Sequence, residues 1–308
     1  MTRHHSLPSV QSLCAGLAFV AMLALAMPDA KAQQAYKSPD DAAGALAAAV
    51  KSGARKEILR VLGSDGEDIV SSGDDVADAE SRARFTTAWE AKHSIKTEGD
   101  KKAVIILGND DFPFPIPLMK NKSGWEFDTA AGRLEILYRR IGRNELDAIQ
   151  TCLAFVDAQN EYAEKDRGQG AGVYAQRIVS TTGKKDGLYW PGEDSPLGEM
   201  AAQASSEGYK VGQGPIPYHG YYFRVLTQQG PNAPGGTLNY VVKGKMIGGF
   251  ALLAYPAEYG NSGVMTFLVN HNGVVYQKDL GDYTNKLVKR MNWFDPDQTW
   301  KKVDAAKP

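Results

Sequence analysis

The chain has 308 residues, of which 43% are hydrophobic and 23% are charged, and its 35 Lys and Arg residues nearly balance its 36 Asp and Glu residues. This balance excludes the basic surface on which nucleic-acid binding depends, and no polybasic stripe suits an anionic membrane. With only two Cys residues, the protein depends on its hydrophobic core for stability, which is feasible at this length.

The first 32 residues contain the three parts of a secretory signal peptide in the usual order. Arg3 lies in a charged start, an apolar run covers residues 17–27, and Ala30-Lys31-Ala32 is a small-residue cleavage site. The apolar run is shorter than the ~20 residues that a membrane-spanning helix needs. We therefore predict a signal peptide at 1–32, a periplasmic or secreted location, and a soluble mature protein without a membrane span.

Residues 33–141 are predicted to form an α+β domain in which helices precede a small antiparallel sheet. Ser38 can cap the first helix, Pro39 fits its first position, and Gly53 can end it. Prolines at alternate positions confine the middle strand to an edge of the sheet. The expected helices lie at 39–51, at 55–62 and from 74 onward, and the expected strands lie at 103–107, 114–119 and 125–128.

A domain boundary is expected near Gly142, because a glycine at this position can end a helix over 133–141. Asn144 can then cap a second, longer helix, which we expect to end near Asp166. Cys152 lies in the apolar stripe of this second helix. At such a position a thiol is more commonly a buried apolar side chain than a reactive one.

For residues 142–308 we predict a domain in which the long helix packs on an antiparallel sheet of four to five strands. Asn272-Gly273 lies between alternating apolar residues and favours a type I′ hairpin turn, and Lys243-Gly244 marks another turn. Both domains therefore belong to the α+β class. The expected strands lie at 221–226, 238–242, 245–255, 264–270 and 274–280.

His219 is the most suggestive polar residue of the chain, because tyrosines surround it. Aromatic faces and hydroxyl groups can together line a ligand pocket, and the predicted domain junction can add further aromatic residues. The alternative is a structural role for this cluster at the start of a strand. The candidate pocket residues are Tyr189, Trp190, Tyr218, His219, Tyr221 and Tyr222.

Patterns for metal, cofactor or nucleophilic sites are weak. The histidines after residue 32 have no metal-ligand spacing, and neither a phosphate-binding loop nor a dinucleotide fingerprint occurs. Ser262 lacks the Gly-x-Ser-x-Gly elbow, because Val264 replaces the last glycine. Cys152 and His219 can be imagined as a pair for acyl transfer, but burial on an apolar helix face disfavours the thiolate. We therefore predict no catalytic residue, no metal, no cofactor and no nucleic-acid partner.

The leading hypothesis is an exported protein that is not an enzyme and that acts by binding an envelope protein or a small ligand, or by supporting an envelope assembly. The alternative is a periplasmic hydrolase, or a small-ligand binder, whose pocket lies near His219. The surroundings of His219 discriminate between these hypotheses. A hydrolase needs this imidazole in an open cleft, within hydrogen-bond reach of a carboxylate or of a hydroxyl nucleophile.

Four segments carry a resemblance to a known family: Gly142–Glu145, Lys184–Pro191, Tyr218–Tyr222 and Gly244–Phe250. Through them the chain after residue 32 resembles the exported bacterial domain-of-unknown-function family 2950. This family has no established activity, so the resemblance implies kinship and export but no reaction.

A second resemblance concerns residues 144–281. Ala158–Tyr162, Gly220–Phe223 and Gly263–Phe267 follow the layout of the globular part of type IV pilins and pseudopilins. This resemblance implies a pilin-like fold, with a helix packed on an antiparallel sheet. Pilins have a long apolar helix directly before this unit, whereas this chain has the predicted N-terminal domain there. The resemblance therefore extends to the fold and not to filament assembly.

Overall fold

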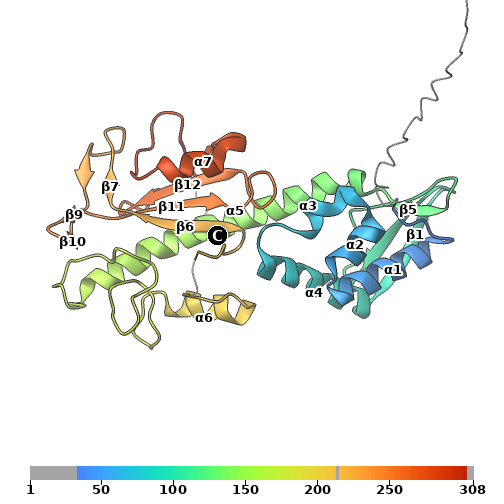
Figure 1. The fold of residues 1–308 in the computed structure, drawn as a ribbon, viewed down its shortest axis with the longest axis horizontal. Helices are drawn as coiled ribbons and strands as arrows, with labels where there is room; N and C mark the ends of the chain where they lie inside the picture. The colour runs from blue at the N-terminus through green and yellow to red at the C-terminus, as the bar shows by residue number, and fades with distance from the viewer. Residues whose placement is uncertain (1–32, 213–214, 304–308) are drawn as a thin grey trace, which may run out of the picture. The chain divides into compact units, whose positions relative to one another are not determined.

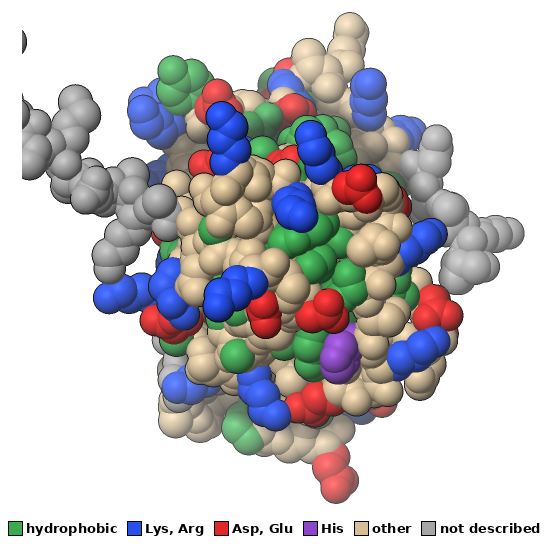
Figure 2. Space-filling view, turned by 90° about the vertical axis from the view of Figure 1, so that its right-hand side faces the viewer, with side chains coloured by type: hydrophobic (Ala, Val, Ile, Leu, Met, Phe, Trp, Pro, Cys, Tyr) green, Lys and Arg blue, Asp and Glu red, His purple; other side chains and the backbone are tan. Residues whose placement is uncertain are grey.

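The computed structural model describes residues 33–212 and 215–303 (Figure 1), and the predicted signal peptide at 1–32 lies outside these residues. Within the described chain, no helix combines the length and the apolar character that crossing a membrane requires. Figure 2 shows one face of the molecule, on which Lys and Arg side chains alternate with Asp and Glu around a few hydrophobic groups. This mixture of signs agrees with the near-neutral composition.

In the first part of the described chain, helices precede a small antiparallel sheet. The first helix is capped as predicted: the Ser38 side chain accepts a hydrogen bond from the Asp41 N–H, and Gly53 ends the helix with a φ of 67°. The elements are α1 (Pro39–Ser52), α2 (Arg55–Leu62), a 3-10 turn (Ser64–Gly66), α3 (Glu67–Val70), α4 (Asp75–Ala91), β1 (His93–Glu98), β2 (Lys102–Leu107), β3 (Phe112–Pro113), β4 (Leu118–Lys120) and β5 (Trp125–Phe127).

The small sheet has the strand order β1-β2-β4-β5, and β3 pairs with β2. β1 is an addition to the predicted strands, and most of its residues are exposed, so no apolar alternation marks it in the sequence. The predicted strand over 114–119 is wrong in extent and in its place at an edge, because β4 pairs with both β2 and β5. The paired residues end at Pro113, the Phe114 N–H still donates to the Ile105 carbonyl at 2.7 Å, and pairing resumes at Leu118. Pro115 and Pro117 have no N–H to donate to a neighbouring strand.

One continuous helix, α5 (Thr129–Glu164), replaces the two helices predicted on either side of Gly142. A glycine in a helix interior destabilises the helix by about 1 kcal/mol relative to alanine. The packing of both ends of α5 against buried clusters can outweigh this loss. The prediction that Asn144 caps a helix is also wrong. Its side chain is buried in the middle of α5 and donates a hydrogen bond to the Ser262 carbonyl at 2.9 Å.

Two separate clusters of buried side chains lie along α5. The first belongs to α1, α2 and the small sheet and reaches α5 at Ile136, whereas the second begins on α5 at Ala148. The predicted boundary falls between these clusters, but inside a continuous helix. The division into domains 33–141 and 142–308 therefore remains a prediction.

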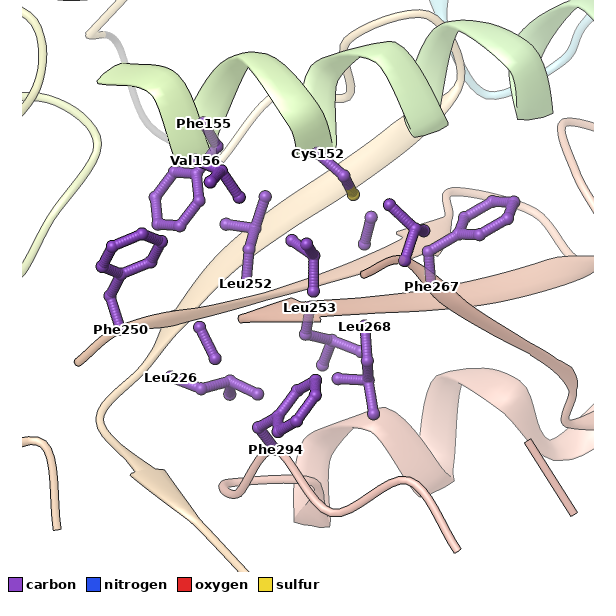
Figure 3. Close-up of a cluster of buried hydrophobic side chains, with 14 of the residues drawn as sticks. Cys152, Phe155, Val156, Leu226, Phe250, Leu252, Leu253, Phe267, Leu268 and Phe294 are labelled. Carbon is purple, nitrogen blue, oxygen red and sulfur yellow. The ribbon is translucent and has the colours of Figure 1, made fainter. Parts of the chain in front are cut away.

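The second cluster surrounds a five-stranded antiparallel sheet with the order β14-β13-β12-β11-β6. α5 crosses one face of this sheet and α7 lies against the other (Figures 1 and 3). The predicted fold class, α+β with a long helix on an antiparallel sheet, is confirmed. The elements are β6 (Tyr221–Leu226), β11 (Ala251–Pro256), β12 (Met265–Asn270), β13 (Tyr276–Asp279), α7 (Thr284–Leu287) and β14 (Lys301–Lys302), with 3-10 turns at Gly281–Tyr283 and Val288–Arg290.

Figure 3 shows how α5 packs on the sheet: Cys152, Phe155 and Val156 point from the helix toward the strands, and Phe155 lies beside Phe250. On the opposite face, Phe294 and Leu268 fill the space toward α7. Cys152 is completely buried, as predicted. Burial raises the pKa of its thiol to about 12, so the thiolate is not accessible at neutral pH.

The remaining elements are short: α6 (Gly198–Glu207), and two ribbons in which β7 (Gln228–Gln229) pairs with β8 (Leu238–Asn239) and β9 (Val241–Val242) pairs with β10 (Lys245–Met246). Lys243 and Gly244 have φ values of 49° and 79°, which confirms a turn there and gives it the type I′ form. The predicted strand over 245–255 is wrong in extent, because Gly248 and Gly249 interrupt it.

The type I′ turn predicted at Asn272-Gly273 is also wrong. Only Gly273 of this pair has a positive φ, and pairing of β12 with β13 already ends at Leu268 and Tyr276. The loop is longer because the buried Asn270 organises it. Its side chain accepts from the Asn272 N–H at 3.1 Å, and its carbonyl accepts from the Gly273 N–H at 2.8 Å.

Candidate functional site

A tight turn places His219 directly before β6. Tyr218 and Tyr221 exchange both of their backbone hydrogen bonds, at 2.8 and 3.1 Å, around His219 and Gly220. The φ values of these two central residues are 47° and 76°, the geometry of a type I′ turn. Gly220 is required here for a second reason, because a Cβ at this position would lie 2.5 Å from the Asn144 amide nitrogen.

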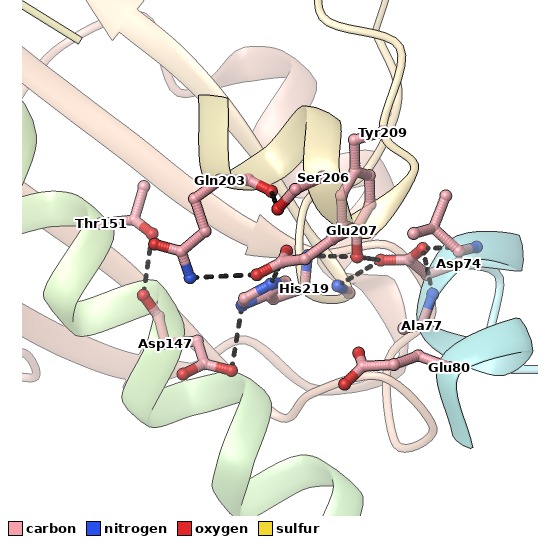
Figure 4. A network of polar contacts seen from close by, with 12 residues as sticks. Asp74, Ala77, Glu80, Asp147, Thr151, Gln203, Ser206, Glu207, Tyr209 and His219 are labelled. Carbon is pink, nitrogen blue, oxygen red and sulfur yellow. Dashed lines mark hydrogen bonds and ion pairs between the residues drawn. The ribbon is translucent and has the colours of Figure 1, made fainter. Parts of the chain in front are cut away.

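The His219 side chain is held between two carboxylates from different helices (Figure 4). Its Nδ1 lies 3.1 Å from Asp147 on α5, and its Nε2 lies 2.8 Å from Glu207 at the end of α6. Burial disfavours the charged imidazole, but the hydrogen bonds and charges of these two carboxylates outweigh burial and raise the pKa of His219 to about 9. At neutral pH the ring is therefore an imidazolium that donates from both nitrogens.

Asp74 fastens the same turn to α4 (Figure 4). Its buried carboxylate accepts hydrogen bonds from the Gly220 N–H at 2.8 Å and from the Tyr209 hydroxyl at 2.9 Å, and it also caps α4 through the Ala77 N–H. The Tyr209 hydroxyl in turn accepts from the His219 N–H at 3.2 Å. Burial, together with the charge of Asp74, raises the pKa of Tyr209 well above its usual range.

We call His219, Asp147, Glu207, Asp74 and Tyr209 the His219 clamp. Their arrangement suits a structural role better than acid–base catalysis. Both nitrogens of His219 are engaged, and the ring remains charged at neutral pH, so it has no free lone pair with which to take a proton. Tyr218 stacks on the ring at 4.1 Å between centroids, and burial raises the pKa of its hydroxyl to about 12. Across the described residues, no cluster of three or more His, Cys, Asp or Glu side chains has the geometry of a metal site.

A cavity of about 440 Å³ lies beside β6, next to this clamp. It contacts the consecutive residues Tyr222, Phe223 and Arg224. Consecutive side chains of a strand point to opposite faces of the sheet, so a cavity that contacts all three runs along the strand edge. We call it the β6 groove; its walls include Phe155, Ile178, Val179, Tyr189, Met200, Tyr209, Tyr218, Leu252 and Tyr255.

β6 is an edge strand of the five-stranded sheet, and its outer side carries free backbone groups. Tyr221 bonds outward to Tyr218, and Pro256, which lies opposite Tyr221 on β11, has no N–H to offer. Alternate residues of an antiparallel strand bond to the same neighbour, so the N–H and C=O groups of Phe223 and Val225 also point outward. Within the described chain these outward groups have no hydrogen-bond partner.

A side-chain donor without a partner also lies at the groove. Arg224 donates from its Nη2 to the carbonyls of Val288 and Met291, which fixes the guanidinium against the turn after α7. Its Nε is buried and has no hydrogen-bond partner among the described residues. Buried donors are rarely left unpaired, so the groove combines apolar walls with unmet hydrogen-bonding capacity.

The structure brings four of the six predicted pocket residues together. Tyr189, Tyr218 and Tyr222 line the β6 groove, and His219 lies behind Tyr218 in the clamp. Tyr221 lies elsewhere: its ring is in the core, 5.8 Å from that of Phe267, and its hydroxyl donates to a backbone carbonyl.

Trp190 also lies away from the groove. Its ring is buried, its indole N–H donates to Asp194 at 2.9 Å, and the Arg167 guanidinium lies 5.0 Å from the ring centroid. The hydrogen bonds of Lys185 and Trp190 hold the pKa of Asp194 well below its usual range. Through these contacts Trp190 packs against the loop after α5 and has a structural role there.

Sequence reasoning missed the partners of His219. Asp147, Glu207 and Tyr209 are not among the candidate residues that the sequence indicates. One local signal does exist, because Glu207 directly precedes the helix-ending Gly208 and so lies where the chain turns back toward the strands. Asp147 and Glu207 meet only in three dimensions, and no sequence spacing indicates that meeting.

A family model described as "Protein of unknown function (DUF2950)" matches residues 33–303. The match covers most of the chain, so the chain belongs to this family. No match was found among curated proteins, and none was found among solved structures.

Proposed function

We propose that this member of the family is an exported protein that is not an enzyme and that binds an envelope protein through the β6 groove. The partner contributes an extended, largely apolar segment, which adds to the sheet as a new strand beside β6. The observation that carries this proposal is the cavity of about 440 Å³ along the free edge of β6.

The backbone of β6 supports strand addition. Phe223 and Val225 present two N–H and two C=O groups on the outer edge of the strand. An added strand satisfies such groups in register, and these main-chain bonds supply affinity while the side-chain pockets supply specificity. Exposed edges otherwise invite unwanted association, so an edge kept free inside a walled groove points to a dedicated partner.

The walls support an apolar partner. On the α5 side of the sheet the groove is lined by Phe155 and Leu252, and on the other side by Tyr222 and Tyr255. Side chains of an added strand point alternately to these two sides, so apolar residues at every position would be buried. Burial of apolar surface contributes about 25 cal/mol per Å², which is the main source of affinity at such a site.

The clamp around His219 supports the same proposal. It fixes the turn from which β6 begins, and Tyr218 connects it directly to the groove. The alternative of a hydrolase that uses His219 receives less support, because a saturated imidazolium is a poor general base. The same groove also has a volume typical of small-ligand sites, so a small apolar ligand is the competing occupant.

Export and an envelope location are part of the proposal. They rest on the charged start, the apolar run and the small-residue cleavage site of residues 1–32. A helix packed on a sheet with a free edge strand suits contacts with a partner within an envelope assembly. Sequencing the N-terminus of the protein recovered from a periplasmic fraction tests export, and we expect it to begin at Gln33.

The binding proposal can be tested with labelled peptides and the mature chain. The probes are fluorescein-labelled peptides in which Val, Ile or Phe alternates with Thr, flanked by Lys residues for solubility. We expect saturable binding in fluorescence anisotropy. Two analogues of the best binder carry N-methyl groups on alternate residues, in opposite registers. Only the analogue that blocks the N–H groups facing β6 is expected to lose binding.

The register comparison is an internal control, because both analogues have the same side chains and the same number of methyl groups. A protein variant, Val225→Pro, removes one outward N–H and is tolerated at an edge strand. We expect it to bind the parent peptide at least about tenfold less tightly, a loss of about one hydrogen bond. Equal binding of both analogues would favour a small apolar ligand instead, and absence of binding by all the peptides would refute strand addition.

A further inference from the structure

A second cavity, of about 450 Å³, lies between α4 and α5 and shares no lining residue with the β6 groove. Its interior is apolar and belongs to the first buried cluster, whereas arginines gather in the walls formed by α4 and α5. The apolar lining includes Leu46, Ile58, Phe85, Leu107, Ile116 and Ile136.

The arginines lie on α4 and α5, on the surfaces of these helices that line the cavity. On α4, Arg82 lies four residues after Asp78 and three before Phe85, so these side chains share one face. On α5, Arg139 and Arg143 lie three and seven residues after Ile136 and share another face. With Arg84 and Arg140 the cavity has five arginines, against the two carboxylates of Asp78 and Asp110.

Three of the five arginines already have partners. Arg84 pairs with Glu80, Arg139 pairs with Glu135, and Arg140 donates to two backbone carbonyls and to the Asn261 side chain. Arg82 and Arg143 have no ion-pair partner within the described part of the chain. At Arg82 and Arg143 the cavity wall therefore carries positive charge that no ion pair of the described residues neutralises.

The positive charges also disfavour one another. Burial lowers the pKa of Arg143 and the nearby charge of Arg84 lowers it further, whereas the charges of Asp147 and Glu80 partly offset both effects. Burial likewise lowers the pKa of Arg140, which the charge of Asp78 partly offsets and that of Arg143 reinforces. An anionic group placed among these guanidinium groups would accept charge-assisted hydrogen bonds and relieve this repulsion.

We propose that this cavity binds a single-chain amphiphile with an anionic head group, with the chain in the apolar interior and the head group at Arg82 and Arg143. An inorganic anion alone would leave the apolar interior unused, and an uncharged apolar molecule would leave the arginines unused. A fatty acid and a lysophospholipid share the required chemistry. The volume of about 450 Å³ is within the range of small-molecule sites.

The test uses the intact mature protein, stripped of bound lipid, in isothermal titration calorimetry below the micelle concentration of each probe. The probes are dodecanoate, dodecanol and acetate, which separate the contribution of the chain from that of the charge. We expect dodecanoate to bind at least about tenfold more tightly than dodecanol, and acetate not to bind. Lysophosphatidylglycerol tests whether a phospholipid head group is accepted in place of a carboxylate.

The double variant Arg82→Gln, Arg143→Gln should weaken dodecanoate binding at least about tenfold and leave dodecanol binding unchanged. The matched control is Arg290→Gln, which removes an exposed arginine outside the cavity and should bind as the wild-type chain does. Thermal unfolding of each variant establishes that it is folded. If the double variant does not fold, the comparison of dodecanoate with dodecanol on the wild-type chain still tests whether the cavity prefers an anionic head group.

Three results would overturn the proposal: no binding of dodecanoate, equal affinity for dodecanoate and dodecanol, or unchanged binding by a folded double variant. Competition with the peptide probes of the β6 groove separates the two sites. Because the cavities have no residue in common, dodecanoate should leave peptide binding unchanged. Displacement of the peptide by dodecanoate would place the amphiphile in the β6 groove and refute the second site.

Discussion

His219 makes the stability of the fold depend on pH at neutral to mildly alkaline values. Burial works against its charge, but Asp147 and Glu207 outweigh burial and raise the pKa of the imidazole from 6.5 to about 9. The folded protein thus holds the proton more tightly than the unfolded chain does, so protonation stabilises the fold. The difference corresponds to at most about 3 kcal/mol, because the side chain is 21% exposed and solvent weakens both pairs.

The direction and the range of this effect follow from the two pKa values. Below 6.5 both states carry the proton, and the full contribution is present. As the pH rises from 6.5 to about 9 the unfolded chain loses the proton first, so stability declines through this interval. Above about 9 the folded state has lost the proton as well, and the contribution is gone.

The assay is urea unfolding of the wild-type chain and of His219→Asn, from about pH 6 to about pH 9.5. Asn tolerates the left-handed backbone of this turn but cannot ionise, so the variant removes the charge with little change in backbone strain. We expect the free energy of unfolding of the two proteins to differ most at the acidic end. The difference should shrink by up to about 3 kcal/mol at the alkaline end.

A matched control is His93→Asn, since His93 stacks on Trp89 and has no carboxylate partner among the described residues. Its unfolding free energy, measured at the same pH values, provides the baseline for replacing an imidazole that has no carboxylate partner in the described part of the chain. If the difference between His219→Asn and the wild-type chain were constant with pH, the imidazolium clamp would be refuted, whatever the absolute stability of the variant.

Three further predictions concern packing and backbone geometry. Cys152→Ser places a hydroxyl at a completely buried site and should lower the free energy of unfolding by about 1–3 kcal/mol in urea titrations, with no loss of ligand binding. Gly220→Ala places a Cβ 2.5 Å from a buried amide nitrogen, at a φ of 76°, and should cost about 2 kcal/mol or more. Gly244→Ala has similar strain but open space around it, so it should cost about 1 kcal/mol; equal losses would contradict the steric argument. The fragment 142–308 retains the larger buried cluster and should melt cooperatively at a lower temperature than the full chain, whereas aggregation without a cooperative transition would show one interdependent domain.

Local sequence signals predicted the elements whose ends are set by near neighbours. Ser38 and Gly53 delimit α1 through contacts within one helical turn, so the sequence alone is sufficient there. Gly142 failed as a signal because the position has open space around it and both ends of α5 are anchored in buried clusters. A weak helix-breaking preference at one residue is smaller than the packing of a helix of 36 residues.

The candidate site was predictable only in part. An aromatic cluster around His219 pointed to the turn before β6, and three of its predicted neighbours line the β6 groove. The charge state of the imidazole was not predictable, because it depends on Asp147 and Glu207, which approach from two other elements. The free edge of β6 likewise depends on the strand order of the sheet, which side-chain alternation does not reveal.

Polar contacts of α5 preorganise the β6 groove, which we propose as a binding site. Glu145 accepts hydrogen bonds from the N–H groups of Val264 and Met265, at 3.0 and 2.9 Å, which fixes the start of β12 to the helix. Asp147 on the same helix holds His219, and so fixes the start of β6. Both strands are therefore anchored to one helix. Preorganisation of this kind would reduce the entropy lost when the proposed partner strand binds beside β6, and so favours binding of even a short segment.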